Sequence, residues 1–209
     1  MKRKAAIRAA VIVATAFLLG LARPGVSSAQ SLSSLRIGDS LSKLSSLGPV
    51  SDSGSYKGME LRKWVLPNGN ELSVTIGSNG HIVYLESDWD GKNDDPACDL
   101  PGLHFGVTTL SELRKRFGSN GFGFKERGPG VKTEDGFVMM NSWEVGTVVI
   151  TFYTKIEADE YDRVKATGAN PSPADYARLD AISIADADYA KSEWGDRVYD
   201  PQYKKIEWK

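Results

Sequence analysis

The chain has few of the side chains that catalysis and metal binding usually require. Its 209 residues include one cysteine and two histidines, His81 and His104. It contains no Gly-x-Ser-x-Gly, His-Glu-x-x-His or Cys-x-x-Cys motif. The single cysteine, Cys98, excludes an internal disulfide, and we interpret it as a buried or idle thiol, with an intermolecular disulfide as the alternative. These absences predict a protein that is not an enzyme and holds no cofactor.

The chain also lacks an excess of positive charge. It has 26 Lys and Arg residues against 27 Asp and Glu residues. Residues 1–29 contain five of the basic residues and no acidic residue, so the remainder has 21 basic and 27 acidic residues and a net charge of −6. Nucleic-acid binding needs clustered positive charge, so this composition excludes nucleic acid as a partner and disfavours an anionic membrane surface.

Long hydrophobic runs are missing except at residues 9–21, directly after a basic start. This run is too short to span a membrane, and its position after basic residues is typical of a signal peptide. Ser27, Ser28 and Ala29 supply the small residues of a cleavage site. We therefore predict a signal peptide over residues 1–29, a mature periplasmic or secreted chain from Gln30, and no stable membrane insertion after cleavage. An uncleaved N-terminal anchor is the alternative.

Two stretches, residues 37–48 and 105–118, each carry the start and stop signals of one short helix. In each stretch, polar residues that can cap a helix precede apolar residues at helical spacing, and a glycine ends the run. The first has Asp39 or Ser40 as cap and Leu41, Leu44 and Leu47 as its apolar face, and the second has Thr108 or Thr109 with Leu110, Leu113 and Phe117. The repeated signal predicts a repeated fold unit.

Strand-like segments follow both predicted helices. In the first half they cover residues 56–66, 71–76 and 81–87, and Asn-Gly dipeptides that favour tight turns separate them. They predict a three-stranded antiparallel meander, whereas the polar residues 51–55 before them are predicted to be a loop. The second half repeats the order with residues 137–145, the alternating Val148, Ile150 and Phe152, and residues 179–185; Trp143 corresponds to Trp64.

The sequence therefore predicts an α+β fold of two tandem units. In each unit, short helices pack on an antiparallel β-meander, and the two meanders form one continuous concave sheet. The predicted units are residues 30–95 and 104–190, with residues 96–103 as linker and residues 191–209 as a C-terminal tail that lies on the body. An insertion at residues 154–178 interrupts the second unit, and we expect a short helix in its front part.

Four aromatic residues fall in linker or loop segments, where they could contact a partner. They are Trp89, Tyr161, Tyr176 and Trp194. Trp and Tyr dominate the binding energy of protein interfaces, so we predict a protein-binding surface at these positions. The expected partner is another envelope or secreted protein.

An acidic run at residues 88–95 offers an alternative site. Its candidate ligands are Asp88, Asp90, Asn93 and Asp94, because calcium prefers several oxygen ligands on a tight loop. The run lacks the closing glutamate of a calcium hand, and a solvated linker is the other interpretation. The alternative function is thus a small-molecule or calcium-binding envelope protein.

The repeated unit of capped helix and Trp-containing strand resembles the repeat of β-lactamase inhibitory proteins and of the SmpA/OmlA outer-membrane assembly lipoproteins. The residues that carry the resemblance are Ile37, Gly38, Ser40, Leu44, Leu47, Gly48 and Trp64, and then Phe105, Gly106, Thr108, Leu113, Phe117, Gly118 and Trp143. The resemblance implies a tandem, secreted, non-enzymatic binding protein, either inhibitor-like or an adaptor in envelope assembly. The lipidated cysteine of the lipoproteins is missing here, and one cysteine cannot form the disulfides of the inhibitors.

Overall fold

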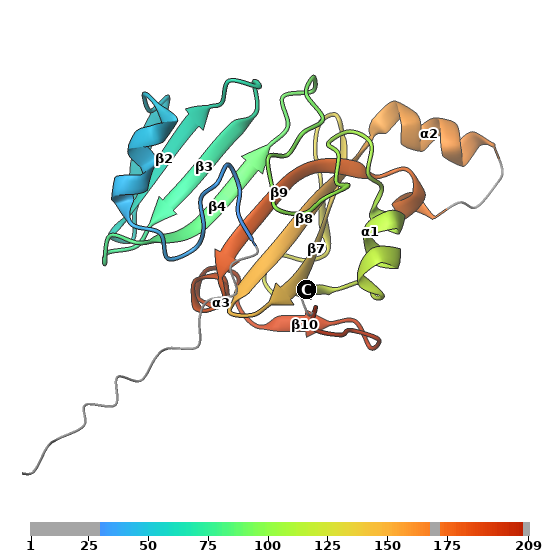
Figure 1. Cartoon of the computed structure of the whole chain (residues 1–209). Coiled ribbons are helices and arrows are strands. Elements are labelled where there is room, and N and C mark those ends of the chain that lie inside the picture. Colours follow the sequence, from blue (N-terminus) through green and yellow to red (C-terminus); the bar gives the residue numbers. More distant parts are fainter. Residues whose placement is uncertain (1–29, 168–171, 207–209) are drawn as a thin grey trace, which may run out of the picture.

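One large antiparallel sheet dominates the structure. The computed structural model describes residues 30–167 and 172–206. Its ten-stranded sheet has the order β1-β2-β3-β4-β9-β8-β7-β5-β10, and β6 pairs with β7 beside this path. The helices are few and short, and they lie around the sheet (Figure 1). The protein is therefore β-rich.

The strands are β1 (Asp52–Tyr56), β2 (Met59–Val65), β3 (Glu71–Ile76), β4 (Ile82–Asp88), β5 (Phe122–Phe124), β6 (Gly130–Lys132), β7 (Gly136–Val145), β8 (Val148–Glu157), β9 (Arg178–Asp186) and β10 (Arg197–Tyr199). The α-helices are α1 (Leu110–Phe117), α2 (Ala158–Ala166) and α3 (Ala187–Trp194), and the 3-10 helices are η1 (Leu41–Leu47) and η2 (Pro173–Asp175).

The predicted meander of the first half is confirmed. β2 pairs with β3 and β3 with β4, both antiparallel, so that Trp64 lies opposite Leu72 and Val74 opposite Leu85. The prediction of a loop at residues 51–55 is wrong, because β1 pairs with β2 along its whole length. Its serines and glycine carry no strand signal, but a tight turn with positive φ at Lys57 and Gly58 folds β1 back onto β2.

The predicted α+β fold of two tandem units is wrong. The antiparallel pairing of β4 with β9 makes one ten-stranded sheet, and β5, β6 and β10 in the later half have no counterpart in the earlier half. The repeated helix signal also gives two different results, a 3-10 helix at η1 and an α-helix at α1. A short local signal specifies a turn of helix, whereas pairing between distant strands decides the architecture.

The apolar core covers both faces of the sheet. The larger cluster lies on one face and includes Trp64 and Trp143, both almost fully buried. The smaller cluster lies on the other face, where α3 brings Ala190 and Trp194 against Phe122 and Phe124. Cys98 is half-buried beside the larger cluster, and burial raises the pKa of its thiol to about 11.

The later segments partly match the prediction. The short helix expected in the insertion is confirmed as α2, and the rest of the insertion forms the end of β8, η2 and the start of β9 within the described residues. The C-terminal segment lies on the body as expected, because β10 pairs with β5 and Tyr203 packs against both core clusters. The predicted signal peptide lies outside the described residues.

Candidate functional site

A surface cleft of about 530 Å³ lies where β7 begins and β8 ends, next to α2. Figure 1 shows α2 directly after this end of β8. The sheet provides Phe137, Met139 and Ile156, α2 provides Ala158, Tyr161 and Asp162, and the β6–β7 hairpin provides Lys132, Thr133, Glu134 and Gly136, with Pro173 completing the lining. This volume falls within the range of pockets that bind ligands in proteins.

The tight turn between β6 and β7 shapes one wall of the cleft. The Thr133 N–H donates to the Gly136 carbonyl, and the Ala158 N–H donates to the Asp135 carbonyl, which ties the turn to the start of α2. A Cβ atom on Gly136 would lie 2.2 Å from the Ile156 carbonyl oxygen, so only glycine permits this approach. The glycine thus keeps the hairpin against β8.

A small ion-pair network supports the same wall. The Lys155 ammonium donates to Asp135 at 2.5 Å and lies 3.1 Å from Glu157. The hydrogen bond from Lys155 lowers the pKa of Asp135 below its usual value, and the hydroxyl of Thr133 contributes in the same direction. These contacts position the turn without occupying the cleft.

Aromatic side chains remain exposed at the cleft. Phe137 and Tyr161 each keep 43% of their surface exposed. Isolated exposed apolar residues are common, but aromatic residues gathered at a concave surface are typical of binding sites. The cleft is therefore the best candidate for a functional site in the described part of the chain.

Three charged side chains line the cleft without an ion pair among the described residues. They are Lys132, Glu134 and Asp162. Neighbouring carboxylates of α2 do have partners, since Asp159 pairs with Arg163 and Glu160 lies 3.7 Å from Arg178. The unpaired charges can therefore take part in recognition at little cost.

The structure does not bring the four predicted contact aromatics to one surface. Tyr161 lines the cleft, and Tyr176 is half-buried against the larger core cluster. Trp89 packs on Gly106, where a Cβ atom would lie 2.2 Å from the indole ring, and Trp194 is 8% exposed within the smaller cluster. Contact with a partner stays a prediction for all four, and Tyr161 has the most accessible side chain.

Sequence reasoning missed Phe137 and Lys132 as site residues. From the sequence, Phe137 was assigned only to a strand, and Lys132 was given no role. The signal that could have found them is the polar stretch Thr133–Gly136, with Asp135-Gly136, between Val131 and the apolar run at residues 137–140, which predicts a hairpin. The ends of projecting hairpins are commonly exposed, so their apolar residues are candidates for contact.

Three of the four candidate calcium ligands already use their side-chain oxygens in local contacts. Asp90 accepts hydrogen bonds from the backbone N–H groups of Lys92 and Asn93, and Asn93 accepts one from Asp95. Asp94 lies 3.1 Å from the His104 ring. Within residues 30–167 and 172–206, no group of three or more His, Cys, Asp or Glu side chains could hold a metal ion. Calcium binding stays a prediction that a calcium titration of the melting temperature would test.

Asp88, the fourth calcium candidate, has an unusual environment on the sheet. It lies opposite Glu71 in the β3–β4 register and makes no ion pair or side-chain hydrogen bond within the described residues. Burial first, and then the charges of Glu86 and Glu71, raise its pKa to about 7, against the opposing effect of Lys63. Lys63 instead donates to Glu71 at 2.6 Å.

The fold and the cleft together define a β-rich protein with one continuous sheet and a partly aromatic surface cleft. No protein-family model and no curated protein sequence matches the chain. The proposed kinship with β-lactamase inhibitory proteins and SmpA/OmlA lipoproteins is therefore wrong: no model of that superfamily matches, and the sheet is not built from two equivalent units. The repeated residues that suggested it are short apolar patterns, which many helices share.

Among solved structures, the chain is similar to an extracellular protein containing an SCP domain from Bacillus anthracis str. Ames. The sequence identity is 10% and the TM-score is 0.39, with coverage of 80% of this chain. The chain spans about half the length of that protein, namely 50%. A likeness of this strength supports no inference about fold or function. In the part of the chain that the structure describes, no helix has the length and hydrophobicity needed to cross a membrane.

Proposed function

We propose that this protein is an exported, non-enzymatic module that binds another envelope or secreted protein at the cleft around Phe137 and Tyr161. The observation that carries the proposal is the exposure of both aromatic rings in a cleft with a volume of about 530 Å³. The basic and then apolar start of the sequence supports export. The partner could be an enzyme that the module inhibits or a protein that it helps to assemble.

The fold supports a role as a rigid carrier of this surface. Phe137 lies in β7, which pairs with β8 over ten residue positions, and Tyr161 lies in α2, directly after β8. Binding side chains on regular elements lose less conformational freedom than those on free loops. The cleft can therefore present its aromatic rings in a defined arrangement before a partner arrives.

A capture experiment with matched variants tests the proposal. The mature chain, immobilised, is exposed to periplasmic extract and culture fluid of the source cells, and captured proteins are identified by mass spectrometry. We expect Phe137→Ser combined with Tyr161→Ser to reduce capture of the specific partner by about tenfold or more, because hot-spot aromatics carry most of the binding energy.

The matched control replaces two apolar residues at the other end of the sheet, Leu61→Ser with Val65→Ser. These side chains are 36% and 64% exposed, so the control removes a similar amount of exposed apolar surface. Thermal unfolding of each variant confirms that it is folded. Equal capture by the cleft variant and the unmodified chain, or equal loss in the control, would contradict the proposal.

A further inference from the structure

The outer edge of β6 presents unpaired backbone groups next to the cleft. The hydrogen bonds of Thr133 to Gly136 and of Met140 to Pro129 set the alternation of the β6–β7 ladder, which makes Val131 and Val138 the hydrogen-bonded pair between them. In an antiparallel pair, the residues between such positions direct their N–H and C=O groups away from the partner strand. Gly130 and Lys132 therefore direct their backbone groups to the outer edge.

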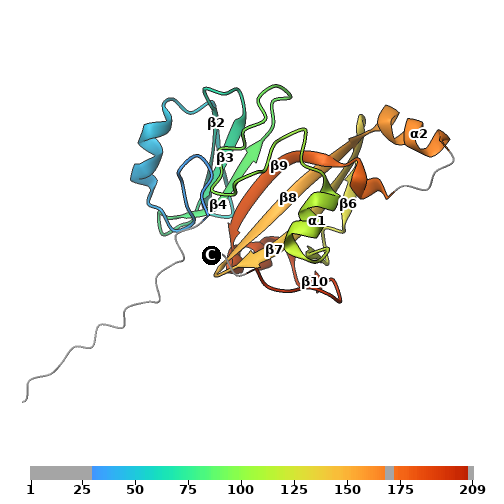
Figure 2. The same ribbon diagram turned by 45° about the vertical axis from the view of Figure 1, so that its right-hand side comes forward.

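No second strand covers this edge in the described part of the chain. Among those residues, β6 pairs with β7 alone, and Figure 2 shows β6 at the margin of the sheet near α2. Val131 and Lys132 are exposed, and Gly130 is half-exposed. The edge can thus accept hydrogen bonds from an extended segment and donate hydrogen bonds to it.

The side chains of an added strand would reach the cleft. Residues placed opposite Gly130 and Lys132 lie on the same face as their β7 partners, Met139 and Phe137, and both of these line the cleft. A Cβ atom on Gly130 would lie 3.0 Å from Cε1 of Phe137, so the aromatic ring extends across the glycine toward the free edge. An apolar side chain opposite Gly130 would pack on that ring.

The positive charge of Lys132 determines which residue is favoured opposite it on the added strand. Lys132 has no ion pair within the described residues, and opposite charges directly across a strand pair stabilise it, whereas like charges destabilise it. An acidic side chain opposite Lys132 satisfies this ammonium. For the same reason the lysine disfavours pairing with β6 of a second copy in a register that places the two lysines opposite each other.

We propose that a segment of the partner protein adds to the outer edge of β6 as an antiparallel strand, with an acidic residue opposite Lys132 and, two positions later, an apolar residue opposite Gly130. This inference rests on the proposed function and specifies how the partner is recognised. Backbone hydrogen bonds provide affinity in this mode of binding, and alternate side chains provide specificity. The sheet also ends at β1, whose five residues are exposed, and at β10, but among the described residues neither strand contributes to the lining of the cleft.

The test selects random linear peptides, displayed on phage, against the immobilised mature chain. We expect the selected peptides to share the order acidic, any, apolar, and to compete with one another for one site. Synthetic versions are then titrated by fluorescence anisotropy against two variants. Lys132→Ala removes the ammonium and keeps the backbone N–H, whereas Lys132→Pro also removes the outward N–H while leaving the bonds to β7 in place.

We expect Lys132→Pro to weaken binding by about tenfold relative to Lys132→Ala, because one carbonyl of the bound peptide loses its donor. A second measurement does not depend on the folding of a variant: N-methylation of the peptide amides that face β6 should abolish binding by the unmodified chain, and methylation of the intervening amides should not. Failure to select any peptide, or equal binding by both variants and both methylated peptides, would overturn the inference.

The two proposals can fail separately. If Phe137→Ser with Tyr161→Ser abolishes capture of the natural partner but Lys132→Pro leaves it unchanged, the partner binds at the cleft without adding a strand. If peptides bind the edge as expected but the cleft variant captures the natural partner normally, edge addition is real and the proposed function is wrong. If Phe137→Ser with Tyr161→Ser and Lys132→Pro each lose capture of the natural partner, whereas Lys132→Ala still captures it, both proposals are supported.

Discussion

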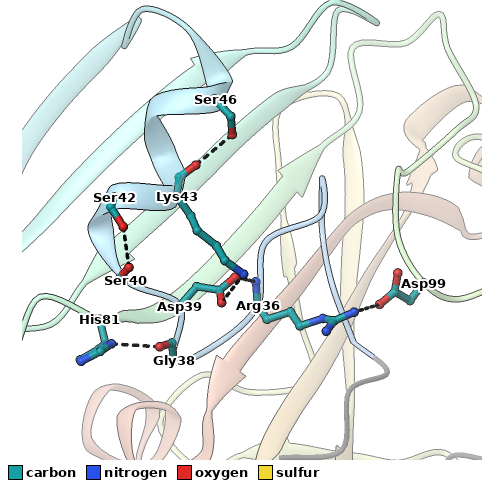
Figure 3. Close-up of polar contacts among 9 residues, drawn as sticks. All are labelled: Arg36, Gly38, Asp39, Ser40, Ser42, Lys43, Ser46, His81 and Asp99. Carbon is teal, nitrogen blue, oxygen red and sulfur yellow. Dashed lines mark hydrogen bonds and ion pairs between the residues drawn. The ribbon is translucent and has the colours of Figure 1, made fainter.

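The helical segments η1 and α1 open the two halves of the chain with similar sequences, yet they fold differently. Thr109 caps α1 through a capping box with Glu112, and Gly118 ends the helix with a left-handed conformation. Ser40 makes no capping bond in η1: its hydroxyl pairs with Ser42 (Figure 3). The difference shows that a polar residue before an apolar repeat predicts a helix but does not decide its type.

The environment of each segment explains the difference. Leu110 and Leu113 are fully buried, so α1 has an apolar face that tertiary packing stabilises. In η1, Leu44 is buried while Leu41 is 37% exposed. Asp39, a predicted cap, accepts instead from the Arg36 N–H before the helix and from Lys43 (Figure 3). A single buried leucine and a misdirected cap leave a 3-10 helix.

Truncating the equivalent first leucines should give the largest contrast. Leu110→Ala removes a fully buried side chain, so we expect it to lower the free energy of unfolding by about 2–5 kcal/mol. Leu41→Ala removes a partly exposed one and should change it by less than about 0.5 kcal/mol. Urea unfolding followed by tryptophan fluorescence measures both. Similar losses would show that η1 is packed as tightly as α1.

The acids that end β4 and β9 allow a second comparison. The pKa of Asp88 in the folded state is about 7, above the ordinary 3.8. The Asp88 carboxylate therefore binds a proton more tightly in the folded protein than in the unfolded chain. The free energy of unfolding therefore falls as the pH rises from about 4 to about 7. Asp88→Asn should remove this loss and, allowing for partial exposure, stabilise the protein at pH 8 by about 1–2 kcal/mol, with little effect at pH 4.

Asp186, at the end of β9, should respond in the opposite direction. Its carboxylate accepts from the N–H groups of Asp188 and Tyr189 and caps α3. Asp186→Ala should destabilise the protein by about 1 kcal/mol at pH 8. Denaturant unfolding at both pH values measures the pair of variants. A destabilising Asp88→Asn at pH 8 would show that this carboxylate has a favourable partner.

The smallest expected contrast concerns the two caps themselves. Thr109→Ala removes a capping bond and should cost about 1 kcal/mol, whereas Ser40→Ala removes no such bond and should cost less than about 0.3 kcal/mol. Calorimetric melting temperatures measure the difference, with Thr109→Ser as the variant that keeps the cap. Equal costs would mean that Ser40 caps η1 in solution.

Local features of the fold were predictable from the sequence, and distant pairings were not. The Asn68-Gly69 and Asn79-Gly80 turns and the alternation around Val74 specify the first meander within a short stretch of chain. The apolar run in β4 predicts a strand but does not reveal that β9 is its neighbour. A single continuous sheet was expected, but the two halves contribute different sets of strands to it, so the assumption of two equivalent units was wrong.

The candidate site was predictable only in part, for the same reason. Tyr161 was identified because it lies in an insertion with few apolar neighbours in sequence. Trp89 and Trp194 looked equally available, but Gly106 and the aromatic residues of β5 cover them in space. Phe137 has the pattern of a core strand residue, yet 43% of its surface is exposed at the cleft beside α2.

The central position of β4 has a consequence for the growing polypeptide. β4 completes its hydrogen bonding only with β9, and residues 89–177 lie between the two strands. While the ribosome makes those residues, the earlier strands already exist with an open inner margin, and non-local pairing of this kind is slow. The nascent chain should therefore need shielding, by a holding chaperone or by transport in an unfolded state, until the late strand arrives.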